Sequence, residues 1–360
     1  TCSHKLSFFK VKLLSTRRNF LKNTTMLAAG LGVSPLLSSS PLRSYQKEEV
    51  INGKVRIAVI GVGMGCRDLQ GALTDNPWVH CVGMCDVNKV RLEEQLARFK
   101  KDFPEQTVSI KAYTDFREVL ANKEIDGVII ATPDHWHPYI FAEALKAGKA
   151  IYVEKPVGNS ISECNAMMDF QKKYKGVVTT GLWQTSQRYF RAANEILKSG
   201  VLGDVYKVQL WLCQSTNPRP SVEDSEAPST LDYDMWLGPA PERPFNNSRF
   251  RGWRGFWDYG GGQQTDWGVH WIDSAFDGLK ALGLCDREYP DAVFSIAYKD
   301  PASFNETPSC QTSIFQYKNF HIEWAQQVAY LYNRNQGVAW VGSKATLVCN
   351  REGYELIPEK

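Results

Sequence analysis

Two segments of the sequence hold side chains that could move a proton and stabilise an alkoxide. Lys155 lies in the triplet Glu154-Lys155-Pro156, after an apolar run, where its ammonium could bond a reacting hydroxyl. Asp266 and His270 follow a glycine triplet and lie four residues apart. If this segment is helical, the carboxylate can orient the imidazole and stabilise its charged form. These residue types suit carbinol oxidation, in which a base takes the hydroxyl proton as hydride leaves.

A glycine-rich turn supplies a second chemical signal. The run 55–60 predicts a strand, and it leads into residues that could cradle a pyrophosphate: Gly61, Gly63, Met64 and Gly65. Cys66 replaces the usual third glycine and is small enough for close packing. Asp86 ends the next predicted strand, where a carboxylate would accept hydrogen bonds from the ribose and repel a 2′-phosphate. The pattern favours NAD over NADP, with turn glycines and a capping aspartate as the alternative interpretation.

The elements around this turn alternate between strand and helix, as in a parallel sheet covered on both faces. β-branched runs predict six strands, at 55–60, 80–85, 109–113, 127–131, 150–153 and 177–180. Apolar residues spaced by three and four predict helices between them, for example at 88–101 and 161–174. We therefore predict an α/β, doubly wound Rossmann domain over residues 52–182, with Lys155 at the sheet edge where open α/β folds bind ligands.

The second half of the chain changes character near residue 205. Strand patterns recur at 205–212, 292–298, 312–317, 320–328 and 338–349. The later ones have no helical pattern between them, which predicts a mostly antiparallel sheet. Residues 214–262 are rich in Pro, Gly, Asn and aromatic residues and are too long for a passive connection. We expect this region to face a substrate.

Three motifs resemble the glucose–fructose oxidoreductase and inositol dehydrogenase (Gfo/Idh/MocA) family. In order, they are Ala131-Thr132-Pro133-Asp134-His135-Trp136-His137, Glu154-Lys155-Pro156, and a glycine triplet followed by Asp266-Trp267-Gly268-Val269-His270-Trp271-Ile272-Asp273. The resemblance spans about residues 52–349. It implies that residues 183–360 form an α/β domain with an open, mostly antiparallel sheet, which binds a carbohydrate-like substrate and mediates homo-oligomers. Relatives usually continue past the point corresponding to Lys360, so we expect this domain to be C-terminally incomplete.

The motifs also suggest the surroundings of the catalytic pair. The resemblance implies contacts to the nicotinamide half of the cofactor for Thr132, Pro133, His137 and Glu154. Gln184, after the sixth predicted strand, is expected to line the same pocket. His135 and Trp136 are expected to pack or to gate. The weaker substrate candidates, each more often structural than functional, are Tyr189, Arg251, Trp253, Arg254 and Asp273.

Charge and cysteine usage exclude other classes of protein. Residues 1–47 hold eight Lys and Arg residues and no acid, so the rest of the chain is mildly acidic despite a formal net charge of +3. A nucleic-acid partner is therefore disfavoured. The nine cysteines are scattered, with no Cys-x-x-Cys pair. We predict neither a metal site nor a disulfide framework.

The leader, residues 1–47, resembles a twin-arginine export signal. Arg17-Arg18 is followed by Phe20-Leu21-Lys22 and by a weakly apolar stretch at 26–37 that glycines interrupt. That stretch is shorter than a membrane span requires. We predict export by the twin-arginine route to the periplasm, without a membrane span. A basic amphipathic helix at the chain end is the alternative.

Taken together, these signals predict an NAD(H)-dependent oxidoreductase acting on a sugar or sugar derivative, with a tightly retained cofactor. Two alternatives stay open. A branch of the resembling family cleaves glycosides through transient oxidation by NAD; it carries Glu-Val-Pro where this chain has Glu154-Lys155-Pro156, so Lys155 favours a dehydrogenase. A redox-silent NAD-binding protein would lack the base or the lysine, and this chain has both.

Overall fold

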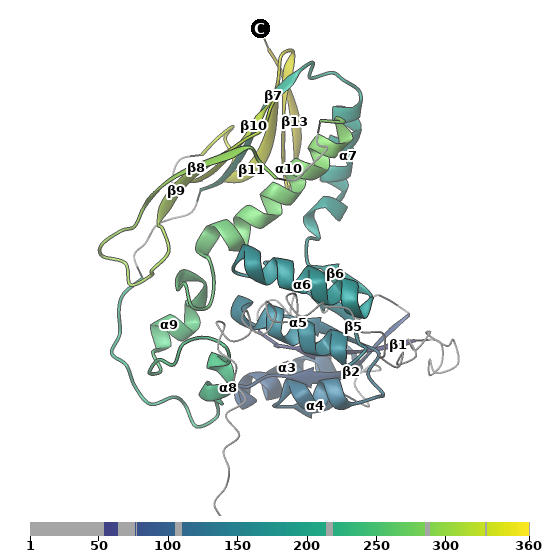
Figure 1. Cartoon of the computed structure of the whole chain (residues 1–360), viewed down its shortest axis with the longest axis vertical. Helices are drawn as coiled ribbons and strands as arrows, with labels where there is room; N and C mark the ends of the chain where they lie inside the picture. The colour runs from purple at the N-terminus through teal and green to yellow at the C-terminus, as the bar shows by residue number, and fades with distance from the viewer. Residues whose placement is uncertain are drawn as a thin grey trace, which may run out of the picture.

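The computed structural model describes residues 54–63, 76, 78–104, 110–213, 219–284, 289–327 and 330–359. The predicted leader, residues 1–47, lies outside these ranges, as do Met64 and Gly65 of the predicted phosphate-binding turn. An α/β layer system is built on β1 to β6, and a second, larger sheet is built on β7 to β13; α7 links the two, and a long excursion of the chain leaves the second sheet after β7 and returns to it at β8 (Figure 1).

The first sheet is parallel throughout, with the strand order β3-β2-β1-β4-β5-β6. Its strands are β1 (Val55–Ile60), β2 (Val79–Cys85), β3 (Lys111–Tyr113), β4 (Gly127–Ile130), β5 (Ala150–Val153) and β6 (Val178–Thr180). All six predicted strands are confirmed. β4 is buried at every position, as expected for a central parallel strand covered on both faces.

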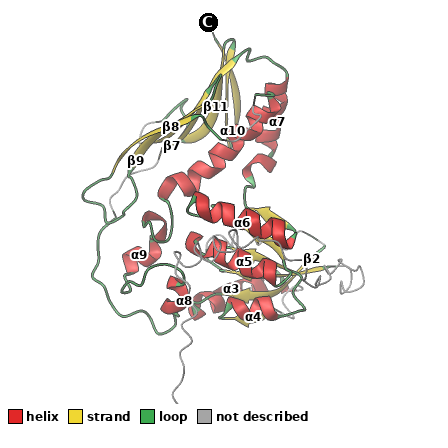
Figure 2. Cartoon of the chain, viewed as in Figure 1, coloured by secondary structure: helices red, strands yellow, loops and turns green. Residues whose placement is uncertain are grey.

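Helices cover both faces of this sheet (Figure 2). They are α3 (Lys89–Asp102), α4 (Phe116–Ala121), α5 (His137–Lys146) and α6 (Ile161–Tyr174). Polar caps set where the two longest begin: Asn88 Oδ1 accepts the N–H of Arg91 at 3.1 Å, and Ser160 Oγ accepts that of Glu163 at 3.2 Å. Leu92 and Phe99 of α3 belong to one core cluster, and apolar residues of α4, α5 and α6 belong to another.

The second sheet has the order β13-β12-β11-β7-β10-β9-β8 within the described residues. Its strands are β7 (Val205–Cys213), β8 (Ala292–Tyr298), β9 (Cys310–Gln316), β10 (His321–Gln327), β11 (Gln336–Gly342), β12 (Ala345–Asn350) and β13 (Gly353–Pro358). Every pair is antiparallel except β10 with β7, so the mostly antiparallel prediction is confirmed. The prediction of a single strand at 338–349 is wrong, because the chain reverses at Ser343-Lys344 between β11 and β12. β13 is a further strand that the sequence does not predict.

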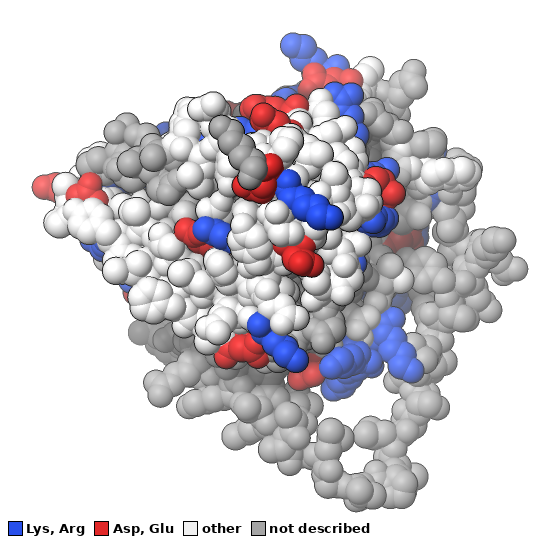
Figure 3. Space-filling view, turned by 90° about the horizontal axis from the view of Figure 1, so that it is seen from above, with Lys and Arg blue, Asp and Glu red and all other residues white. Residues whose placement is uncertain are grey.

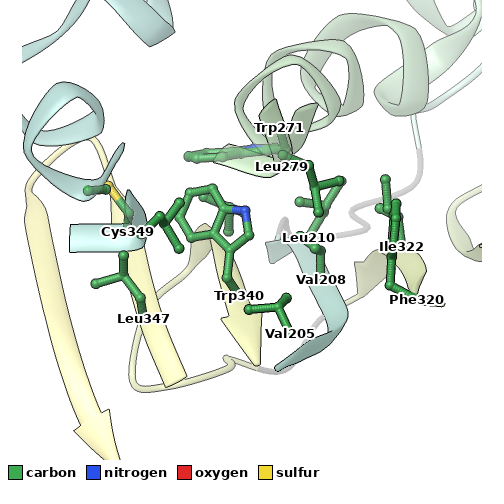
Figure 4. Packing of buried hydrophobic residues seen from close by; sticks show 14 of the residues in the cluster. Val205, Val208, Leu210, Trp271, Leu279, Phe320, Ile322, Trp340, Leu347 and Cys349 are labelled. Carbon is green, nitrogen blue, oxygen red and sulfur yellow. The ribbon is translucent and has the colours of Figure 1, made fainter. Parts of the chain in front are cut away.

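Two helices, α7 (Arg188–Lys198) and α10 (Val269–Ala281), pack on one face of the second sheet. Large aromatic side chains fill the space between them and the strands. Trp271 and Trp340 lie there, each at most 1% exposed (Figure 4), and Trp324, also fully buried, belongs to the same cluster. Gly278 permits this contact, because a Cβ there would lie 2.5 Å from the Trp340 ring. The packing fixes α10, whose first turn carries His270.

Part of the chain between β7 and β8 folds into a separate apolar cluster with two short helices, α8 (Tyr233–Leu237) and α9 (Asn247–Arg251). It docks on the first domain, where the side chains of His135 and Trp136 both meet the Trp236 carbonyl at 3.0 Å. His135 and Trp136 are therefore packing residues. The region predicted to face a substrate is in large part a packed lobe, and only its last part reaches the site described below.

The surface is of mixed charge. On the face seen in Figure 3, basic and acidic side chains are interspersed over a largely uncharged surface. Among the described helices, none is both long enough and apolar enough to cross a membrane.

Candidate active site

The site begins at the carboxyl edge of the first sheet, at the turn after β1. Gly61 has a φ of +89°, and a Cβ there would lie 2.7 Å from backbone atoms of Ala131 and Thr132. A glycine is therefore required where these two turns cross. Gly63 is different, since among the described residues the nearest atom to a Cβ would be Arg91 Nη1 at 3.8 Å. The described part of the chain therefore leaves room for a ligand at the Gly63 backbone.

Asp86 connects this turn to the end of β2. The residue is 7% exposed, and its carboxylate accepts the N–H of Val62 at 3.0 Å and that of Asn88 at 2.9 Å. Burial raises the pKa of Asp86, although Arg91 and the two N–H groups oppose the shift. The carboxylate thus lies beside the glycine turn, as the sequence predicts.

The turns after β4 and β5 are joined by one imidazole. His137 Nε2 meets the Thr132 carbonyl and Nδ1 meets the Pro156 carbonyl, both at 2.8 Å, and the Lys155–Pro156 bond is cis. Burial lowers the pKa of His137 to about 4, against the effect of the two carbonyl oxygens, and the neutral ring can donate its one N–H to either of them. Both ring nitrogens are used inside the protein. His137 therefore positions the two turns, and its nitrogens are not placed for the predicted contact with a cofactor.

Lys155, Asp266 and Arg254 form the charged centre of the site. Lys155 Nζ donates to Asp266 Oδ1 at 2.5 Å and to the Asp266 carbonyl at 2.6 Å, and Arg254 Nε lies 3.1 Å from the same Oδ1. The Lys155 and Asp266 side chains are 15% and 17% exposed. Burial alone would raise the pKa of Asp266, but Lys155 and Arg254 outweigh it and hold that pKa below its usual value. One carboxylate thus holds two cations.

The predicted pairing of Asp266 with His270 is wrong in this structure. Among the described residues, the imidazole makes no hydrogen bond to Asp266, and its buried Nδ1 has no partner. The physical reason is local. Residues 264–268 form a turn of π-helix before α10 begins at Val269, and the wider turn removes the four-residue alignment that an α-helix would give.

His270 is buried against the Trp183 ring, with the ring centroids 5.8 Å apart, and is 4% exposed. Burial lowers the pKa of His270 to about 3; Lys155 and Arg351 act in the same direction, and Asp266 opposes them. The imidazole is therefore neutral at physiological pH, with a nitrogen able to accept a proton.

Gln184 supports the backbone of His270. Its amide nitrogen donates to Ser274 Oγ at 2.9 Å and to the His270 carbonyl at 3.3 Å, and its oxygen accepts Arg351 Nε at 2.9 Å. Gln184 is fully buried, so it is a positioning residue and does not line a cofactor pocket as predicted. Arg351 comes from the turn between β12 and β13 and lies over the rings of Trp183 and Trp267, 4.8 and 4.6 Å from their centroids.

Comparison with known proteins agrees with this arrangement. Residues 55–182 match the oxidoreductase family with an NAD-binding Rossmann fold (GFO_IDH_MocA), and residues 191–280 match its C-terminal alpha/beta domain. The chain belongs to the Gfo/Idh/MocA family. It is thus a member of an NAD-binding oxidoreductase family, and its order of domains follows that family.

Individual relatives differ in what they do. An α-N-acetylgalactosaminidase of Tannerella forsythia is 33% identical over 42% of this chain and 35% of its own length. An inositol 2-dehydrogenase of Salmonella paratyphi B is 24% identical over 41% of this chain and 43% of its own. The chain thus spans less than half the length of these relatives. The WlbA dehydrogenase of Chromobacterium violaceum, solved with NADH and UDP-GlcNAcA, shares the fold at a TM-score of 0.63 and 17% identity, over 86% of this chain and 79% of its own.

The residues present fit the dinucleotide that a Gfo/Idh/MocA protein binds. The Gly63 backbone, which no described side chain closely approaches, suits a pyrophosphate, and Asp86 suits the hydroxyls of a ribose. Thr132 Oγ1 is buried without a partner among the described residues, at the edge where the nicotinamide half would lie. Glu154 accepts from the Tyr152 hydroxyl at 3.1 Å and from its neighbour's N–H at 3.2 Å, and a side chain at Gly181 would collide with it.

The weaker substrate candidates separate into two groups. Arg254 lies in the charged centre, and Trp253 supports it, with the guanidinium 4.2 Å from the indole centroid. Tyr189 packs against the core of the second domain. Arg251 is exposed on α9, and Asp273 is half-buried on α10. The structure therefore brings only the Trp253-Arg254 pair into the site from this set. Pro133 begins the turn that carries Asp134.

Sequence reasoning missed Arg351 and Asp134. No local pattern identifies Arg351, because only the folded sheet brings it to Gln184. Asp134 lies within the motif at 131–137, but the sequence does not predict that it is buried beside charged residues. It is 3% exposed, and burial raises its pKa well above the usual value, with Arg254 opposing.

The position of Arg351 leads to a pH prediction. Replacing Arg351 by Met removes a positive charge that lowers the pKa of His270, so the folded-state pKa should rise. The acid limb of a kcat/KM profile should then move to higher pH. The profile of a Lys146→Met control should stay in place, since Lys146 pairs with Glu143 in the last turn of α5, away from the end that carries His137. An acid limb that does not move in Arg351→Met would show that Arg351 has no electrostatic role at His270.

Proposed function

We propose that this chain is an NAD(H)-dependent oxidoreductase that transfers a hydride to or from a carbinol carbon of a sugar or sugar derivative. The observation that carries the proposal is the bond of Lys155, which follows β5 at the carboxyl edge of the Rossmann sheet, to Asp266, four residues before the neutral His270. Open α/β sheets bind their ligands at this edge.

Each residue would have a separate task. NAD, when bound, supplies the hydride acceptor or donor. Lys155 donates a hydrogen bond to the carbinol oxygen and stabilises the negative charge that develops there. His270 accepts the hydroxyl proton at a ring nitrogen; it is a weak base, but the hydroxyl becomes strongly acidic as the carbon is oxidised. Asp266 holds the ammonium in place, and Gln184 holds the backbone of His270.

The proposal is tested with a panel of sugars, amino sugars, inositols and glycosides. The purified protein, loaded with NAD, is mixed with each compound, and the absorbance of reduced nicotinamide is followed together with product analysis. A dehydrogenase should give an oxidised sugar and reduced cofactor in equal amounts. Free sugar released from a glycoside, with no net change in the cofactor, would contradict it.

The second candidate is a glycosidase that works through transient oxidation. Several curated relatives favour it, including the α-N-acetylgalactosaminidase of Tannerella forsythia and proteins named glycosyl hydrolase family 109. The residue at position 155 opposes it, since Lys155 takes the place of the valine expected in that branch. N-acetylgalactosaminides therefore belong in the panel. A redox-silent protein, the third candidate, would leave every compound and the cofactor unchanged.

Cofactor choice is expected to depend on Asp86. Replacing Asp86 by Ser removes both the acceptor for the ribose hydroxyls and the repulsion of a 2′-phosphate. NAD should bind roughly 10-fold more weakly, the loss expected for a hydrogen bond to a charged group, and NADP should bind more tightly. Titration of both variants with both dinucleotides measures the change. An unchanged preference would mean that another group selects the cofactor.

We also propose export by the twin-arginine route with NAD already bound. The motif in residues 1–47 supports export, and that route carries folded proteins to a compartment where no NAD pool is expected. Protein purified without added NAD should then release nicotinamide dinucleotide on denaturation, close to one per chain. An empty preparation that turns over with exchangeable NAD would argue against retention and would favour a cytoplasmic dehydrogenase.

Self-association through the second sheet is a further part of this proposal. Phe294, Ile296 and Tyr298 alternate along β8, on the sheet face opposite the helices, and are 60% to 65% exposed. Apolar side chains gathered on one exposed face mark an interface. Light scattering should show a homo-oligomer that Phe294→Glu weakens, whereas a monomeric wild-type protein would exclude this role.

A further inference from the structure

Arg254 is held rigidly beside Lys155, although the proposed chemistry does not need it. Its guanidinium lies on the Trp253 indole, and its Nε is anchored on Asp266 Oδ1 at 3.1 Å. Gly260 lets the glycine triplet approach, since a Cβ there would lie 3.1 Å from Arg254 Cα. The side chain is nevertheless 42% exposed, and no ion pair within the described residues engages its two Nη groups. The planar fork of the guanidinium is therefore presented to the site.

The charge around this fork is unbalanced. Asp266 is the one carboxylate that pairs with both Lys155 and Arg254 within the described ranges. Asp134 is close by, but a buried carboxyl with a raised pKa is a poor source of negative charge. The Glu154 carboxylate already accepts from its own neighbours. An anion would therefore be attracted to the exposed side of Arg254.

The two cations are close enough to bind one sugar together. Lys155 Nζ and Arg254 Nε both contact the same oxygen, at 2.5 and 3.1 Å, so they are separated by no more than the sum of those distances. A single sugar can therefore place a hydroxyl on Lys155 and an acid group on the Nη groups of Arg254.

We propose that Arg254 binds the acid group of an anionic sugar, so that the substrate carries a carboxylate or phosphate on the same sugar as the reacting carbinol. The end-on pair of Nη groups matches two oxygens of either acid. The inference rests on the proposed function and narrows its substrate class from sugars in general to sugar acids or sugar phosphates.

Binding of defined probes tests this without relying on turnover. The NAD-loaded protein is titrated with glucuronate, galacturonate, glucose 6-phosphate, glucose and galactose, with tryptophan fluorescence as the readout because Trp253 underlies Arg254. An acid probe should bind at least roughly 10-fold more tightly than its neutral counterpart, and Arg254→Met should remove that preference. The uronates and the phosphate distinguish the two sources of negative charge.

Arg98→Met is the matched control. Arg98 is also about half exposed, at 45%, and also pairs through Nε with an aspartate, Asp102, but on helix α3. The Arg98→Met variant should leave the binding of acid probes unchanged. Arg254→Lys should lose most of the preference for acid over neutral probes, although it keeps a positive charge beside Asp266. The inference is overturned if neutral sugars bind as well as the acids, if no acid binds at tens of millimolar, or if Arg254→Met keeps the preference. If sugar acids bind in a way that depends on Arg254 but never reduce the bound NAD, the proposed function is refuted and the inference about Arg254 stands.

Discussion

Replacing Lys155 by Met is expected to lower turnover by roughly 10² to 10⁴, the range for a group that assists proton transfer and stabilises charge at the reacting atom. The ammonium donates twice to Asp266 and makes no other hydrogen bond to the described residues, so its removal should leave the Rossmann sheet and the affinity for NAD nearly unchanged. Steady-state kinetics and an NAD titration on the same preparation measure both quantities.

The control for Lys155→Met is Lys146→Met, which removes an ion pair with Glu143 on the surface of α5. That variant should retain wild-type turnover and NAD affinity. His270→Ala should resemble Lys155→Met, because it removes the proton acceptor but leaves the cofactor turn intact. Turnover within a factor of about 3 of wild type in Lys155→Met would remove this lysine from the chemistry.

Replacing Asp266 by Asn is expected to reduce both turnover and stability. The amide leaves Lys155 and Arg254 without their shared carboxylate in a site that is largely buried, and breaking such a pair costs about 3 kcal/mol of unfolding free energy. Turnover should fall by roughly 10- to 100-fold, since Lys155 remains but is no longer held. Denaturant unfolding and kinetics measure the two effects.

Two further measurements show how Asp266 acts: the stability of the variant at acid pH, and the turnover of a double variant. The pKa of Asp266 is lowered in the folded protein, so its stabilising contribution is complete above the ordinary range, about pH 4, and is lost as the pH falls through the folded value. The free energy of unfolding of Asp266→Asn should therefore fall less steeply in acid than that of the wild type.

If Asp266 acts through Lys155, the double variant with Lys155→Met should be no slower than Lys155→Met alone. A further large loss would indicate an action on His270 instead.

The order and type of the elements were predictable because the signals are local. β5 and β8 have the predicted bounds, Ala150–Val153 and Ala292–Tyr298, and so does α6, Ile161–Tyr174. β5 is a short apolar run at a predictable place in the alternation of strands and helices, and α6 begins after a serine cap. β13 has no such signal; its outward residues Tyr354 and Leu356 are partly exposed, and its pairing with β12 defines it.

The composition of the site was only partly predictable, because its partners are chosen by contacts over long sequence distances. Lys155 and Asp266 were both predicted, but their direct pairing joins residues 111 positions apart. The π-turn at 264–268 has no sequence signal that separates it from an α-helix, so the sequence predicts a carboxylate partner that the described residues do not give to His270. Arg351 reaches Gln184 across 167 positions, which no spacing rule can predict.

Transfer of hydride from a carbinol carbon to bound NAD, assisted by Lys155 and His270, can be followed directly with a label. Sugars, including uronates, that carry deuterium at each carbinol carbon in turn are mixed with stoichiometric NAD-loaded protein, and the released dinucleotide is examined by mass spectrometry. One labelled position should deliver deuterium to the nicotinamide, and Lys155→Met should reduce the rate of transfer by roughly 10² or more. Product formation with no label on the nicotinamide from any position would contradict hydride transfer to NAD.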